Sequence, residues 1–295
     1  MFRNVVVGVN GSAGGRDAIA LATGLLAKDG NLALAHVHGG DARTRTVSPE
    51  FALSERTRSR ELLEAARSET AIEAGLLLTG SSSVGRGLHE IVERHGADLL
   101  VVGSRSRSLF GRVMVSDHTR SALNGASCAV AVAPAGYAQR PAVLLEIGVG
   151  YDGSPESEHA LAVALELSRE LGARVSAFEA IDLPAGRLSG PGPADESIDR
   201  HLAEARERIA RLDVAPHVAY GDAAEELALY GASVDLLIVG SRGYGPLGRL
   251  VHGSTSQRLA QTARCPLLVL PRAAESREAP NQTEADNEAT ASAAS

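Results

Sequence analysis

The chain has 295 residues, of which 44% are hydrophobic and 22% charged, a composition typical of soluble globular proteins and long enough for about two domains. Its formal net charge of −7 creates no overall positive field for nucleic acid. The sequence contains neither a signal-peptide pattern nor an apolar run near the roughly 18 residues of a spanning helix. Cys128 and Cys265 are too few for a disulfide framework. We therefore expect a cytoplasmic protein without a membrane or nucleic-acid partner.

The first half begins with a strand-like run at residues 1–9 and ends with two apolar segments, 98–103 and 128–134, that are typical of buried strands. Between them, His36 and His38 alternate onto one face of a further strand. This pair lacks a third metal ligand nearby, so the sequence favours a structural or ligand-lining role over a metal site.

The second half shows alternating strands and helices in more detail. Ser154 and Pro155 predict the start of a helix, and Gly172 stands where that helix should end. Strands are expected at 146–151, 174–181, 215–220, 235–240 and 266–270, and further helices at 196–212, after 221–227 and from 254. Short apolar strands that alternate with helices predict an α/β fold, a doubly wound parallel sheet covered on both faces.

The two halves are copies of each other. "GSRSRSLFGRVMVSD" (103–117) matches "GSRGYGPLGRLVHGS" (240–254) at an offset of 240 − 103 = 137, and Cys128 matches Cys265 at the same offset. This period is far longer than that of solenoid repeats, so we interpret it as a duplicated domain. The predicted boundaries are 1–136 and 141–273, followed by a disordered tail at 274–295 whose composition is polar and rich in alanine.

The loop at 240–254 directly follows an apolar strand and leads into the helix predicted from Ser254. Doubly wound folds bind ligands there, outside the carboxyl ends of their strands. Glycines let backbone N–H groups approach phosphate oxygens, and a helix N-terminus adds donors and partial positive charge. Lys28, the only lysine, is followed by Asp29, which excludes a Walker A loop.

Gly240, Gly243 and the pair Gly253-Ser254 have the spacing G-x2-G-x9-G-(S/T). This resembles the signature of ATP-binding universal stress proteins, and the resemblance covers both halves. It implies a tandem member with Rossmann-like domains of the adenine nucleotide alpha-hydrolase type, with ATP as ligand and Mg²⁺ as an accompanying ion. It also implies that Asp152 contacts the nucleotide near its ribose and that the backbone of Ala180 meets adenine. The complete set of expected binding residues is Gly150, Asp152, Ala180, Gly240, Ser241, Arg242, Gly243, Gly253, Ser254, Thr255 and Ser256.

The first half departs from this pattern. Asn10 replaces the aspartate, and Ser106, Ser116 and Asp117 replace the loop residues Gly243, Gly253 and Ser254. Serine at a positive φ costs roughly 1–2 kcal/mol, and a carboxylate about 4 Å from a phosphate repels it by ~1 to ~4 kcal/mol. We therefore expect only weaker binding in the first half, at Gly8, Val37, Gly103, Ser104 and Arg105.

The predicted function is regulatory: an ATP-binding protein that acts through its conformation or through protein partners in stress. A slow ATPase or nucleotidyl transferase remains an alternative, as does an interaction module with vestigial sites. The sequence has no lysine near the loop, no HxGH-type signature and no clustered carboxylates, so we name no catalytic residue and no metal ligand. His252 is interpreted as a loop residue and Cys265 as a buried structural thiol.

The last strand of each half, 128–134 and 265–270, would be an exposed apolar edge unless it were paired. The resemblance implies that this strand mediates pairing between domains, so we expect the two halves to meet there. Homodimerisation of the whole chain is left open.

Overall fold

The computed structural model describes residues 1–39, 49–70, 73–104, 121–182, 194–241 and 254–271. The first half contains β1 (Phe2–Gly8), α1 (Ala13–Leu25), β2 (Leu26–His38), α2 (Pro49–Ser68), β3 (Ala74–Gly80), α3 (Val84–His95), β4 (Leu99–Gly103) and β5 (Ala129–Ala133). The second half contains β6 (Glu146–Gly150), α5 (Pro155–Leu171), β7 (Arg174–Ile181), α6 (Ala194–Ala210), β8 (Ala215–Tyr220), α7 (Ala223–Tyr230), β9 (Leu236–Gly240), α8 (Ser254–Thr262) and β10 (Leu267–Leu270). Two short 3₁₀ helices, η1 (Tyr137–Gln139) and η3 (Gly231–Ser233), complete the described elements. The predicted α/β fold class is confirmed.

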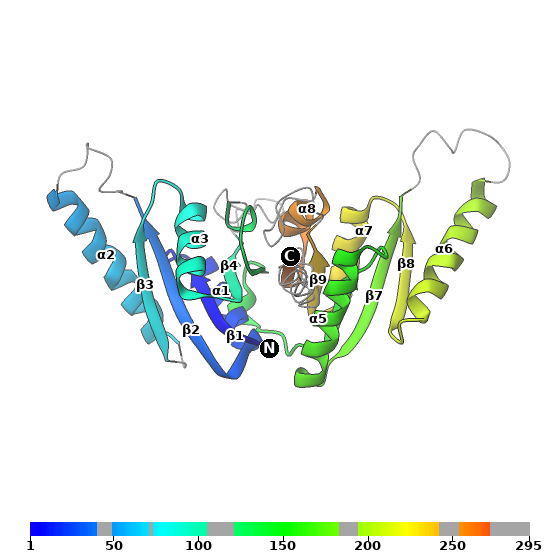
Figure 1. Ribbon diagram of the computed structural model, residues 1–295, viewed down its shortest axis with the longest axis horizontal. Helices are drawn as coiled ribbons and strands as arrows, with labels where there is room; N and C mark the ends of the chain where they lie inside the picture. Colours follow the sequence, from blue (N-terminus) through cyan, green and yellow to red (C-terminus); the bar gives the residue numbers. More distant parts are fainter. Residues whose placement is uncertain (40–48, 71–72, 105–120, 183–193, 242–253, 272–295) are drawn as a thin grey trace, which may run out of the picture.

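The described strands form a single ten-stranded sheet in the order β3-β2-β1-β4-β5-β10-β9-β6-β7-β8. Neighbours are parallel within each half, whereas β5 and β10 pair antiparallel, with Ala131 opposite Leu268. The halves lie side by side as two wings, with α2 and α6 at the outer ends (Figure 1). The expectation that the last strands of the two halves pair with each other is confirmed.

The helix α5 has the ends that its sequence predicts. The Ser154 side chain accepts a hydrogen bond from the Ser157 N–H, Pro155 occupies the first turn, and Gly172 ends the helix at φ 69°. The corresponding helix α1 lacks such a glycine: it ends at Leu25 and the strand β2 begins at Leu26. The register of β2 against β1 shifts near Phe2, which absorbs the extra residues.

Each face of the sheet carries one apolar core layer that runs through both halves. Helices α1, α2, α5 and α6 cover one face, where Ala131 and Leu268 are buried together. Helices α3, α7 and α8 cover the other, where Val130 and Val269 are buried. The two halves thus share their cores across the β5–β10 junction.

The segment between the halves is anchored to α1. The buried carboxylate of Asp17 accepts hydrogen bonds from the N–H groups of Gly136 (3.0 Å) and Ala138 (2.8 Å), around η1. In addition, the N-terminal amino group of Met1 pairs with Glu170 of the second half at 2.6 Å. These contacts hold the segment between the two halves close to the paired strands β5 and β10.

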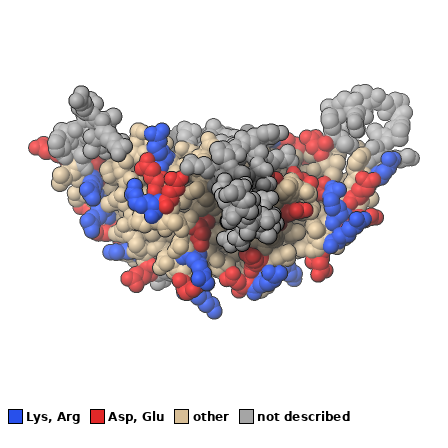
Figure 2. Space-filling model, viewed as in Figure 1, with Lys and Arg blue, Asp and Glu red and all other residues tan. Residues whose placement is uncertain are grey.

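On the face in Figure 2, acidic and basic side chains of the described residues are interspersed over both halves. None of the described helices combines the length and the apolar character needed to cross a bilayer.

Candidate functional site

A pocket opens at the carboxyl ends of β6, β7 and β9, next to the first turns of α5 and α8. Its empty volume, with the open mouth included, is about 620 Å³. Six of the residues predicted to bind nucleotide line it: Gly150, Asp152, Ala180, Gly240, Thr255 and Ser256. The topology brings these six residues together from four separate parts of the second half.

Asp152 lies in the turn between β6 and α5, with its side chain exposed. Its Oδ1 accepts hydrogen bonds from the Ser154 N–H (3.1 Å) and the Ser154 hydroxyl (2.5 Å). The Asp152 N–H in turn donates to the Ser157 hydroxyl at 3.3 Å. The carboxylate is therefore held at the pocket rim by the same serine that caps α5.

Gly240, the first glycine of the loop motif, has a packing role of its own. A Cβ atom at this position would lie 2.6 Å from the carbonyl oxygen of Glu156, in the first turn of α5. The same holds in the first half, where a Cβ on Gly103 would overlap the backbone of Gly14 in α1. Both glycines thus let a helix start close to the end of the strand, which closes one side of each pocket.

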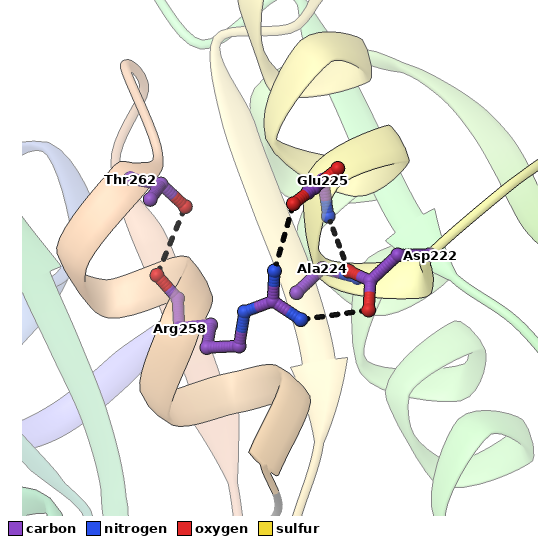
Figure 3. Close-up of polar contacts among 5 residues, drawn as sticks. All are labelled: Asp222, Ala224, Glu225, Arg258 and Thr262. Carbon is purple, nitrogen blue, oxygen red and sulfur yellow. Dashed lines mark hydrogen bonds and ion pairs between the residues drawn. The ribbon is translucent and has the colours of Figure 1, made fainter.

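An arginine network joins the helix α8 to the helix α7 beside the pocket (Figure 3). Arg258 of α8 contacts Asp222 at 2.7 Å and Glu225 at 3.0 Å. Asp222 is also the N-cap of α7 and accepts from the N–H groups of Ala224 and Glu225. The backbone N–H of Glu225, followed by Arg258, lowers the pKa of Asp222 below its ordinary value, so this carboxylate stays charged at neutral pH.

Other predicted residues have different positions. Ser241 is buried behind the pocket rather than lining it, and its N–H donates to the Leu270 carbonyl at 3.0 Å. Ser254 is the first residue of α8. Arg242, Gly243, His252 and Gly253 lie outside the described residues. The remaining lining residues, which sequence reasoning missed, are Tyr151, Ser154, Glu156, Ser157, Phe178, Ala223, Leu227 and Val239.

The first half has an equivalent pocket, with an empty volume of about 900 Å³. Four of its predicted residues line it, Gly8, Val37, Gly103 and Ser104, together with Asn10. Arg105, Ser106, Ser116 and Asp117 lie outside the described residues. The Asn10 Oδ1 accepts from the Ser12 N–H (3.2 Å) and hydroxyl (2.6 Å), which reproduces the turn around Asp152 without its charge.

The two histidines of β2 are not brought together with further ligands. His36 lines the first pocket and its Nδ1 donates to the Val9 carbonyl at 2.6 Å, whereas His38 lies outside the pocket lining. Within the described part of the chain, no group of three or more His, Cys, Asp or Glu side chains could hold a metal ion.

The model of the Universal stress protein family matches residues 1–134 and again residues 145–271. The chain belongs to the universal stress protein family. A universal stress protein of Mycobacterium tuberculosis is 32% identical over 181 residues, which cover 59% of this chain and 61% of that relative. The chain thus matches somewhat less than two thirds of the length of such curated relatives.

Solved structures of the family show the same fold. A universal stress protein from Archaeoglobus fulgidus aligns with a TM-score of 0.65 at 15% identity and covers 91% of this chain and 98% of that one. One universal stress protein has been solved in complex with cAMP. It is 23% identical and covers 35% of this chain and 76% of its own, but its TM-score of 0.28 is too low to guide the placement of a ligand here. The two domains of this universal stress protein are therefore matched to the family by sequence and by fold.

Proposed function

We propose that this protein binds ATP in its second domain and acts as a regulator in the stress response, through its conformation or through protein partners. The observation that carries the proposal is the convergence of six predicted residues on one pocket at the carboxyl ends of β6, β7 and β9. This is the edge at which doubly wound sheets bind nucleotides.

The residues present fit such a ligand. The start of the nine-residue helix α8 borders the pocket through Thr255 and Ser256, and a helix N-terminus favours phosphate through free N–H donors and partial positive charge. Asp152 at the rim would accept hydrogen bonds from ribose hydroxyls, and the backbone of Ala180 would meet the base. A Mg²⁺ ion arriving with ATP would be held mainly by the phosphates, as is usual for this ion.

The first domain would bind ATP weakly at most. Its pocket has Asn10 where the second has Asp152, and its loop sequence has Ser106, Ser116 and Asp117 where the second has two glycines and a serine. One nucleotide per chain is therefore the expected stoichiometry.

The experiment is calorimetric titration with ATP, combined with an assay of nucleotide in the freshly purified protein. We expect one ATP per chain, nearly complete loss of binding in Gly253→Asp through added bulk and charge, and little change in Asp117→Ser because Ser106 and Ser116 remain. Two equal sites in the wild type, or undiminished stoichiometry in Gly253→Asp, would contradict the asymmetric assignment.

The alternatives give different results. An interaction module with vestigial sites would carry no nucleotide and would bind none in the titration. An enzyme would turn over ATP at about 1–1,000 per second, whereas we expect very slow turnover or none because no general base is recognisable in the sequence around the loop. A cytoplasmic location, homodimerisation and unidentified protein partners belong to the same proposal. Cell fractionation tests the location, and light scattering tests homodimerisation.

A further inference from the structure

The two pockets are built from equivalent positions, which makes their differences informative. Strand register aligns Val5 with Ile147 and Leu32 with Val175, so Ala35 in the first half corresponds to Phe178 in the second. Glycine ends the first strand of each half, at Gly8 and Gly150. The apolar wall beside this glycine is formed by Leu88 and Val102 in the first half and by Leu227 and Val239 in the second. These two walls are alike in size and polarity.

The main difference is an aromatic ring in the wall of the second pocket. Phe178 lines that pocket, whereas Ala35 lines the first. Tyr151 also borders the second pocket, but it packs in the core layer on the opposite face of the sheet. The smaller empty volume of the second pocket, about 620 Å³ against about 900 Å³, agrees with a ring projecting from its wall.

The Phe178 ring is fixed from behind. It stacks on Tyr230 with ring centroids 4.7 Å apart and an interplanar angle of 23°. The hydroxyl of Tyr230 pairs with the Ser176 hydroxyl at 2.5 Å, and its ring lies over Gly148, where a Cβ would come within 2.6 Å of it. Phe178 and Tyr230 are only 7% and 8% exposed, so neither ring is free to turn away.

The first half has none of this bracing. By the strand register and the helix starts, Val6, Ala33 and Ile91 stand where the second half has Gly148, Ser176 and Tyr230. An ordinary aliphatic core occupies that space. Phe178 and the three positions that hold its ring in place therefore differ together between the halves.

We propose that Phe178, braced by Tyr230, is the wall on which the nucleobase packs, and that it makes the second site select its ligand by the base. This inference rests on the proposed nucleotide binding. A planar base gains affinity against a fixed aromatic side chain, and a purine offers a larger stacking surface than a pyrimidine. Leu227 and Val239 line the same pocket beside Gly150, and their apolar side chains would help to exclude water from around the base. Phe178 thus contributes to binding of the base, whereas other groups of the site bind the phosphates.

The test compares three ligands, ATP, UTP and inorganic tripolyphosphate, by calorimetry on the full chain. Phe178→Leu keeps an apolar side chain but removes the aromatic face. We expect it to weaken ATP binding about 10-fold, to weaken UTP binding less, and to leave tripolyphosphate binding within about 2-fold. A purely structural role would lower the affinities for ATP and tripolyphosphate in parallel, and that result would overturn the proposal.

Two further variants complete the experiment. Tyr230→Phe keeps the stacked ring and loses only the hydroxyl contact, so we expect lower thermal stability with ATP affinity within about 2-fold of the wild type.

Phe178→Ala enlarges the pocket toward that of the first half. Weaker ATP binding in this variant supports the stacking wall, whereas tighter binding shows that the ring fills the space of the base and overturns it. Where Phe178→Ala fails to fold, the result with Phe178→Leu decides.

The failure of the two proposals can be told apart. A wild-type protein that binds neither ATP nor UTP overturns the proposed function and this inference with it. A wild-type protein that binds ATP no more tightly than tripolyphosphate leaves phosphate binding intact and overturns only the role of Phe178.

Discussion

Asn10 and Asp152 occupy the same turn in the two halves and differ in charge. Each side chain accepts two hydrogen bonds from the serine two residues later, Ser12 or Ser154. An amide oxygen and a carboxylate oxygen serve equally well in this turn, so the turn by itself does not require the aspartate. The turn therefore does not explain the negative charge at Asp152, and in the proposed site this charge would accept hydrogen bonds from the nucleotide.

We expect Asp152→Asn to leave thermal stability nearly unchanged and to weaken ATP binding about 10- to 100-fold, since hydrogen bonds to a charged group contribute roughly 1.5–3 kcal/mol. Calorimetry and thermal unfolding measure the two effects. Asn10→Asp in the first half is the matched control and should leave the affinity of the second site unchanged. Equal affinities in wild type and Asp152→Asn would remove Asp152 from the site.

Both cysteine thiols are buried, which agrees with the interpretation of Cys265 as a structural residue. Burial raises the pKa of Cys128 and of Cys265 to about 12 in each case. Both are therefore protonated in the native protein at neutral pH, and protonated thiols are poor nucleophiles.

An aromatic disulfide reagent at pH 8 should thus detect no rapidly reacting thiol in the native protein and both thiols after denaturation. Folding raises these pKa values above about 9, the ordinary pKa of a cysteine thiol. The contribution of the buried thiols to the free energy of unfolding is therefore complete below about pH 9 and is lost as the pH rises toward 12. A thiol that reacts rapidly in the native state would contradict the burial of its side chain.

At the scale of elements, each pocket depends on how closely a helix approaches the end of a strand. Gly103 in β4 and Gly240 in β9 permit that approach, because a side chain there would meet backbone atoms of α1 or α5. Backbone cannot move aside as a side chain can, so substitution must shift a whole helix.

Gly240→Ala should therefore lower the free energy of unfolding by about 1–3 kcal/mol and weaken ATP binding, because α5 carries the turn of Asp152 at its start. The control is Gly24→Ala inside α1, where nothing lies within 4 Å of the new Cβ. There alanine should stabilise by roughly 0.5–1 kcal/mol. Urea unfolding of both variants measures the difference, and equal effects would contradict this packing role.

The ion pairs of Arg258 link the helix α8 to the start of α7. Arg258→Ala should change overall stability little, because the ion pairs are exposed, but weaken ATP binding about 3- to 10-fold as the first turn of α8 moves. The pKa of Asp222 is lowered on folding, so the network should persist above about pH 4 and be lost as pH falls further. Arg211→Ala, which breaks an exposed pair with Glu207 on α6, is the control. Identical ATP affinities in the two variants would show that Arg258 does not position the site.

Much of this arrangement follows from sequence alone. Ser154, Pro155 and Gly172 delimit α5 as predicted, and the apolar runs became the expected strands. Alternation within β7 shows that Phe178 and Ala180 share a face, but that both of them border a pocket depends on the height at which β6 and β9 end. The contact between Gly240 and Glu156 likewise joins residues far apart in sequence, so no local pattern could reveal it. The break between α1 and β2 has no glycine at the C-cap, which is Leu26 in an extended conformation.

At the scale of the whole molecule, the short antiparallel pairing of β5 and β10 unites two domains into one sheet. Ala131 and Leu268 face each other there with no exposed surface, and apolar layers continue past them on both sides. The junction is therefore part of the core of both domains.

Ala131→Asp should lower the free energy of unfolding by at least about 3 kcal/mol, because it buries a charge that has no partner. Leu229→Asp is the control, since Leu229 is 69% exposed on α7. Urea unfolding followed by circular dichroism compares them. If Ala131→Asp is no more destabilised than the control, the junction does not contribute to the stability of the domains.

The junction between β5 and β10 also bears on how such a protein can evolve. When two copies of a single-domain chain assemble across their last strands, one codon specifies both binding sites, and every mutation appears in each. Here the two sides of the sheet are encoded by separate stretches of one gene, so the turn at Asn10 could change while the turn at Asp152 did not. A half whose binding turn has changed need only keep its last strand and its share of the core to remain under selection, because the other half folds against it.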